Sequence, residues 1–290
     1  MRVVGECSTT ELQNFRLIDP KNVRHAWGNQ AHCNMEFDAF VASGVIKPHS
    51  GSVVIVLHGL MRTHRSMEKL ADYADKNGFQ SILFQYASGR DEVAEHAARL
   101  REVVDSLGPE VTEINFVAHS LGNIVIRHYL ADTADSRTGE QGDQRIHRIV
   151  MIGPPNQGSE MARLLKNSVL FNAIAGKSGS QLSKSWEELK QNLVTPSCEF
   201  GIIAGVGDEK KLVKNFVLQG PSDFTVSLKE TRLNGASDFL VAPFYHTTMM
   251  HQPQTLEATI RFLKHGYFIS EEKQQPIPTT KSDASRNAAG

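Results

Sequence analysis

Four short, mostly apolar runs alternate with segments of helical spacing, and this alternation constrains the fold more than any other feature. The runs are 53–57, 81–84, 114–118 and 148–152. Runs of this length that are apolar on both faces are typical of strands buried in a parallel sheet. Strands that alternate with helices require right-handed crossovers. The sequence therefore predicts an α/β fold with a central, mostly parallel sheet flanked by helices.

Three further segments complete the predicted organisation. Residues 1–50 mix polar residues with isolated apolar ones, so we expect an irregular lead-in with one strand near Phe37–Val45. The α/β domain spans 51–268. An insertion at about 159–195 has two helical stretches joined by Gly-Lys-Ser-Gly-Ser at 176–180, and we expect a small helical cap there. Residues 269–290 are polar, which predicts a disordered tail.

Composition argues against several classes of function. The formal net charge of -1 predicts no general attraction to nucleic acid or to an anionic membrane. No apolar run approaches the roughly 20 residues of a membrane span, and no secretory signal is recognisable, so the default expectation is a cytoplasmic protein. The 3 cysteines lie far apart and the 12 histidines lack zinc-site spacing. We therefore expect no metal or other cofactor, while the oligomeric state stays open.

The strongest local motif is Ala118-His119-Ser120-Leu121-Gly122, which joins an apolar strand to a helix-forming segment. A sharp turn at this point would hold Ser120 in a strained backbone conformation, with its Oγ above the carboxyl edge of the sheet. The residues two before and two after the serine must be small, because the strand and the helix nearly touch there. The N–H groups at the start of the helix would lie beside the reacting centre. The motif predicts that Ser120 is a nucleophile.

A second motif, His58-Gly59-Leu60, directly follows the predicted strand 53–57. Acyl transfer places negative charge on a carbonyl oxygen, and two backbone N–H donors can stabilise it, each by about 2.7–4 kcal/mol if side-chain precedents apply. We expect Leu60 and Leu121 to supply these donors and form the oxyanion hole. Gly59 would permit the close approach, and His58 would brace the loop by hydrogen bonding.

These motifs together resemble the α/β-hydrolase superfamily. The runs 56–60 and 117–122 are similar to those of lipases and esterases in which the first small residue can be alanine. Gly-Pro-Pro-Asn-Gln-Gly-Ser at 153–159 resembles the Pro-x-x-Gly-Ser stretch of many bacterial lipases. The resemblance, from about Val53 to Gly266, implies a serine hydrolase that cleaves carboxylic esters through an acyl-enzyme on Ser120.

The resemblance also implies the chain order serine, acid, histidine, so both partners follow Ser120. His246 comes after the strand-like run 239–242 and shortly before the last helix, where this family has its catalytic histidine. His251 is the alternative base. His265 lies at the basic end of the last helix, a usual place for a cation, and is discarded.

Two aspartates remain open as the acid. Asp223 lies in Gly-Pro-Ser-Asp-Phe-Thr-Val at 220–226, which resembles the family's Asp-Gly-x-Val segment except that Phe224 replaces the glycine. Asp208 also follows a strand and is the alternative, while Asp238 is too close to the histidine loop. We favour Asp223.

The cap suggests the kind of substrate. Its apolar residues, at helical spacing, can either pack on the sheet edge or line an acyl pocket beneath a mobile lid. The second case implies a small-molecule or lipid ester, cleaved by a carboxylesterase or a lipase. An acyltransferase, thioesterase or amidase with the same triad is an alternative, and a non-catalytic binding protein of this fold is another.

Overall fold

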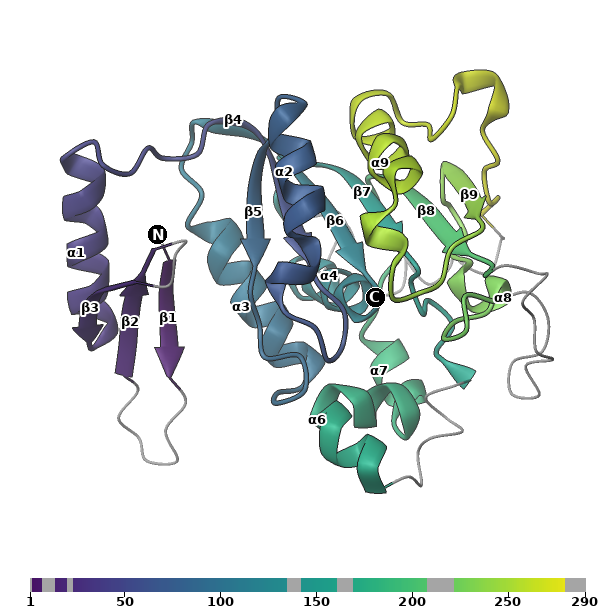
Figure 1. Cartoon of the computed structure of the whole chain (residues 1–290), viewed down its shortest axis with the longest axis horizontal. Helices are drawn as coiled ribbons and strands as arrows, with labels where there is room; N and C mark the ends of the chain where they lie inside the picture. Colours follow the sequence, from purple (N-terminus) through teal and green to yellow (C-terminus); the bar gives the residue numbers. More distant parts are fainter. Residues whose placement is uncertain are drawn as a thin grey trace. The chain divides into compact units, whose positions relative to one another are not determined.

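The computed structural model describes residues 2–6, 14–19, 23–134, 142–160, 169–207 and 222–279 of the 290-residue chain. The chain divides into two compact units, Met1–His49 and Ser50–Gly290 (Figure 1). Within the described residues, no helix has the length and apolarity that crossing a membrane would require.

The first unit is a small sheet with one helix. Strands β1 (Arg2–Glu6), β2 (Asn14–Ile18) and β3 (Arg24–Gly28) pair antiparallel in that order, and helix α1 (Gln30–Ala42) follows. Leu17, Ala26 and Cys33 form its buried core, and Phe37 and Phe40 pack against them.

The prediction of an irregular lead-in with a strand near Phe37–Val45 is therefore wrong. Cys33, Phe37 and Phe40 recur at intervals of three and four residues, which places them on one face of a helix. Asn29 starts that helix, because its side chain accepts a hydrogen bond from the N–H of His32 at 2.8 Å.

The second unit contains the predicted parallel sheet. Its six strands lie in the order β5-β4-β6-β7-β8-β9, and all five pairings are parallel. The strands are β4 (Gly51–Leu57), β5 (Gln80–Phe84), β6 (Val111–His119), β7 (Ile146–Ile152), β8 (Glu199–Gly205) and β9 (Asp238–Ala242). In register, Leu57 pairs with Ala118 and His119 with Ile152, so the carboxyl ends of β4, β6 and β7 meet at one edge. The predicted fold class is confirmed.

Helices cover both faces of this sheet (Figure 1). They are α2 (Glu68–Lys76), α3 (Val93–Asp105), α4 (Leu121–Thr133), α8 (Leu228–Thr231) and α9 (Pro253–His265), with 3-10 turns η1 (His64–Met67), η3 (Met249–His251) and η4 (Glu271–Lys273). Along β4, Val53, Ile55 and Leu57 belong to the core shared with α3 and α4. Val54 and Val56 belong to the core shared with α2 and α9, because successive side chains of a strand point to opposite faces.

The segment predicted as a cap contains helices α6 (Val169–Ser183) and α7 (Trp186–Gln191). The predicted joint at 176–180 lies within α6, where two helical segments meet at a break in the helical geometry at Gly176 (φ 61°, ψ -151°). Beyond this break, the N–H of Lys177 donates to Gly89 O at 3.1 Å and the Ser178 hydroxyl donates to Asp91 O at 2.8 Å. The joint therefore attaches the cap to the loop between β5 and α3.

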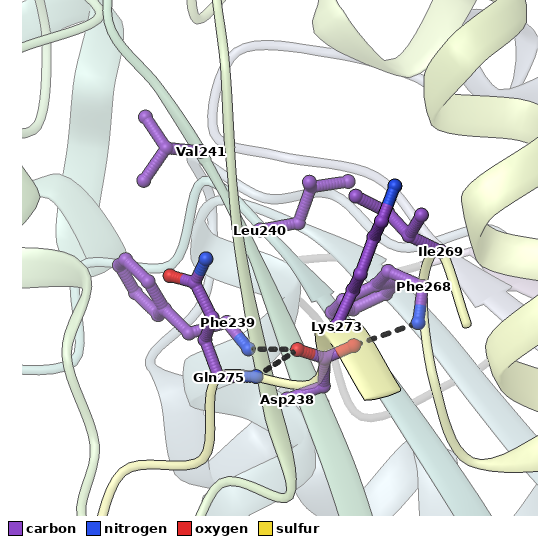
Figure 2. A pocket seen from close by; sticks show the side chains of 8 residues that line it. All are labelled: Asp238, Phe239, Leu240, Val241, Phe268, Ile269, Lys273 and Gln275. Carbon is purple, nitrogen blue, oxygen red and sulfur yellow. Dashed lines mark hydrogen bonds between the residues drawn. The ribbon is translucent and has the colours of Figure 1, made fainter. Parts of the chain in front are cut away.

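The segment after α9 packs against the first residue of β9, Asp238. Asp238 accepts hydrogen bonds from the N–H groups of Phe268 at 2.7 Å and Gln275 at 2.9 Å (Figure 2). Ile277 is buried, and its N–H donates to Ala236 O at 2.9 Å. A cavity of about 220 Å³ lies beside these contacts, and its lining includes none of the predicted site residues.

The predicted disorder is therefore wrong for residues 269–279, while 280–290 lie outside the described residues. A buried carboxylate on β9 and the buried side chain of Ile277 hold the segment in place. The polar composition of the tail gives no sign of either contact.

Candidate active site

Ser120 forms the turn between β6 and α4 in a strained conformation, with φ 53° and ψ -120°. Positive φ is unfavourable for residues other than glycine, so surrounding contacts must hold it. Its N–H donates to Ile152 O at 2.9 Å, and its carbonyl accepts from the backbone N–H and the side-chain amide of Asn123 at 3.1 and 3.0 Å. Both neighbouring elements thus hold the turn in the conformation that the motif predicted.

The small residues around Ser120 have a direct steric explanation. A Cβ on Gly122 would lie 2.8 Å from Leu57 Cβ and 3.0 Å from His58 O, both of which are buried. The same Cβ would lie 3.2 Å from the methyl group of Ala118. Because Gly122 leaves this space open, alanine is tolerated at 118, where the general Gly-x-Ser-x-Gly pattern has glycine.

His246 and Asp223 form a buried pair beside this edge of the sheet. His246 Nδ1 lies 2.7 Å from Asp223 Oδ2, and both side chains are almost completely buried. Asp223 Oδ1 accepts from the N–H groups of Thr225 at 2.9 Å and Val226 at 2.7 Å. A carboxylate only accepts, so Nδ1 of His246 carries a proton, and in the neutral imidazole Nε2 then presents a lone pair. This geometry suits a base whose orientation is set by an acid.

Phe224 directly follows Asp223 and stands where the Asp-Gly-x-Val pattern has glycine. Its φ is 75°, in the region that glycine adopts most easily, so the phenylalanine takes the backbone conformation expected of the missing glycine. Its ring lies 5.3 Å from that of Tyr245, and a Cβ on Gly207 would come within 2.6 Å of it. The ring contacts therefore accompany a strained backbone next to Asp223.

The Ser120 turn and His246 meet where β6 and β7 end. His119 Nε2 lies 2.9 Å from His246 O, and the two imidazole centroids are 4.6 Å apart. Gly153 follows the carbonyl that accepts from Ser120, and a Cβ on Gly153 would lie 3.1 Å from His246 Nδ1. Within the described chain no hydrogen bond joins the Ser120 hydroxyl to the His246 ring. In serine hydrolases without substrate, the hydrogen bond between nucleophile and base is often long.

The predicted oxyanion loop passes directly against Ser120. A Cβ on Gly59 would lie 2.9 Å from His119 Nδ1 and 3.1 Å from Ser120 Cβ, so glycine allows this approach without displacing either side chain. Leu60 follows, and its N–H donates to no acceptor among the described residues. Leu121 is the first residue of α4, so its N–H has no acceptor within the helix. Both predicted donors thus have an N–H without an acceptor among the described residues. Leu121 directly follows Ser120 in the chain, and Leu60 follows Gly59, which lies against Ser120.

Two residues that the sequence reasoning missed hold the oxyanion loop. The Tyr86 hydroxyl donates to His58 O at 2.5 Å, and its ring stacks on His58 at 4.3 Å. The Ser88 hydroxyl accepts from the N–H of Met61 at 3.1 Å. His58 Nδ1 also lies 2.9 Å from Gly59 O, which matches the bracing role expected of this histidine. The only signal for Tyr86 and Ser88 was their position just after a predicted strand.

The structure gives no support for the two alternative site residues, Asp208 and His251. Asp208 lies outside the described residues. His251 is in η3, where its carbonyl accepts from Lys69 Nζ at 2.7 Å, and burial and the Lys69 charge lower its pKa. No carboxylate among the described residues hydrogen-bonds its ring. The described part of the chain also holds no cluster of three or more metal-ligating side chains.

Comparisons with known proteins establish the fold. No protein-family model matches the chain, and no curated protein matches it. Among solved structures, the mature lipase BlEst2 of Bacillus licheniformis superposes with a TM-score of 0.53 at 16% identity, over 75% of this chain and 93% of that one. The metagenomic carboxyl esterase MGS0156 gives 0.52 at 17% identity, over 70% and 67% of the two chains. The hydrolase olei00960 of Oleispira antarctica gives 0.51 at 13% identity, over 75% and 93%. The chain has the α/β-hydrolase fold.

Proposed function

We propose that this protein is a serine hydrolase that cleaves carboxylic esters through an acyl-enzyme on Ser120. The observation that carries the proposal is the buried hydrogen bond of 2.7 Å between His246 and Asp223, on loops that follow β9 and β8. The strained Ser120 turn ends β6 at the same edge of the sheet. A serine, an acid and a histidine in this chain order are the catalytic set of this fold.

Each residue then has one role in the reaction. Ser120 Oγ attacks the ester carbonyl while His246 Nε2 takes its proton, and Asp223 keeps the imidazole in the required tautomer. The N–H groups of Leu60 and Leu121 stabilise the oxyanion. The same proton passes to the leaving alcohol, and water then releases the acid by the reverse sequence.

Ester hydrolysis is favoured over the other reactions of such a triad by the comparisons, since a lipase and a carboxyl esterase share the fold. An acyltransferase, thioesterase or amidase would use the same residues with another acceptor or bond. A purely binding protein would have no need of a buried imidazole–carboxylate pair beside a strained serine, because both cost free energy to maintain.

The test combines a covalent probe with substrates. The protein and its Ser120→Ala variant are treated with a fluorophosphonate and with p-nitrophenyl esters of short to long acyl chains. Ser106→Ala, at the exposed end of α3, is the matched control. We expect labelling and turnover to vanish in Ser120→Ala and to persist in Ser106→Ala. Labelling of Ser120→Ala equal to that of the parent would refute the assignment, and the chain-length profile separates esterase from lipase.

A further inference from the structure

His119 links the nucleophile turn to the histidine loop. It directly precedes Ser120, its side chain is 2% exposed, and its Nε2 lies 2.9 Å from the backbone carbonyl of His246, 127 residues away. No other hydrogen bond in the described structure joins these two loops. The catalytic scheme above does not use this side chain.

The contact determines the tautomer of His119. A carbonyl oxygen only accepts, so Nε2 must carry a proton. Nδ1 is buried without a hydrogen-bond partner and faces Gly59, whose Cβ would come within 2.9 Å of it. Burial lowers the pKa of His119 well below its ordinary value, and the nearby His246, Arg62 and His251 lower it further. The imidazole is therefore a neutral donor.

The position of His119 in the fold makes it a rigid support. It is the last residue of β6, a strand paired on one side with β4 and on the other with β7. His246 lies in the turn between β9 and η3, outside regular structure. The His119 ring contacts the oxyanion loop at Gly59 and the His246 ring at a centroid distance of 4.6 Å. Three loops of the candidate site thus meet on one side chain.

We infer that His119 is a positioning residue: its Nε2–H holds the carbonyl of His246 and so sets the distance between the imidazole of His246 and Ser120. This inference rests on the proposed function of those two residues. Its quantitative consequence follows from proximity, because a displacement of about 1 Å in a reacting group can cost on the order of 10²-fold in rate.

The experiment compares His119→Gln, whose amide can still donate to the carbonyl, with His119→Leu, which is similar in size and cannot. The p-nitrophenyl ester kinetics and the rate of labelling by a small fluorophosphonate are measured for each, after thermal unfolding confirms that each is folded. We expect His119→Leu to lower kcat by roughly 10–100-fold with KM little changed, and to slow labelling by a similar factor. His119→Gln should stay within about threefold of the parent. Equal losses in both variants, or full activity of folded His119→Leu, would overturn the inference.

A second measurement separates this inference from the proposed function. Histidine nitrogen shifts in the parent protein report the tautomer directly by NMR, whether or not the protein hydrolyses esters. We expect a neutral His119 with its proton on Nε2 throughout the pH range of activity. A proton on Nδ1 would overturn the positioning role. If that tautomer is found but the parent neither labels nor turns over esters, the proposed function fails while the contact stands.

Discussion

Replacing Asp223 by asparagine tests the site most sharply, because the structure dictates how the new amide must sit. Oδ1 of Asp223 accepts from two backbone N–H groups, those of Thr225 and Val226, so the amide oxygen of asparagine must take that place. The NH₂ group then faces Nδ1 of His246, where Oδ2 now lies at 2.7 Å. Two donors cannot share this contact, so His246 must move its proton to Nε2.

The expected loss follows from that change of tautomer. With its proton on Nε2, His246 has no lone pair directed at Ser120, and kcat should fall on the order of 10⁴-fold, as in the corresponding substitution of a serine protease. This fall corresponds to about 5.5 kcal/mol of transition-state stabilisation. Stability should fall much less, by about 1–3 kcal/mol, because the two backbone hydrogen bonds to the side chain persist.

Asp238→Asn is the matched control. Asp238 is also a buried carboxylate that accepts three backbone N–H groups, those of Phe239, Phe268 and Gln275. It is remote from the histidine, so its variant should lose stability by about 1–3 kcal/mol and keep kcat. Urea unfolding and p-nitrophenyl ester kinetics on both variants give the comparison. An Asp223→Asn protein that keeps more than a tenth of kcat would refute the reasoning, and so would equal rate losses in the two variants.

Three other perturbations probe the supports of the site. Gly122→Ala places a Cβ 2.8 Å from that of Leu57, and we expect urea unfolding to show a loss of about 1–3 kcal/mol; an unchanged midpoint would contradict the steric argument. Tyr86→Phe leaves the buried carbonyl of His58 without its 2.5 Å partner and should cost about 1–3 kcal/mol and lower kcat at unchanged KM; unaltered kinetics would show that the oxyanion loop does not depend on it. Burial lowers the pKa of His96 from 6.5 to about 4, so the unfolded chain binds more protons between these values. The free energy of unfolding should therefore be highest above pH 6.5 and fall as the pH drops toward 4. The fall should be smaller in His96→Phe.

The fold class and the serine motif can be predicted from the sequence because both depend on residues that are close together along the chain. The strand 114–118, the serine and the following helix are contiguous, and the small residues Ala118 and Gly122 act on atoms within the same turn or the adjacent strand. Strand length, helical spacing and turn chemistry are local properties, so they can be recognised without knowing the rest of the structure.

The predictions for the N-terminal unit and for the tail are wrong for two different reasons. In α1 the helical spacing of Cys33, Phe37 and Phe40 is present in the sequence but is diluted by polar residues. In the tail, the deciding contacts come from Asp238, more than 25 residues earlier, and from one buried isoleucine.

Only the tertiary structure could decide which acid meets which histidine. Asp223 and His246 are 23 residues apart, and nothing near either of them in the sequence reports a shared hydrogen bond. The partner of His119 is a backbone carbonyl, which every residue possesses, so no residue type could mark it. Contacts of this kind arise when the carboxyl ends of separate strands meet at one edge of the sheet, and that meeting is a property of the folded chain alone.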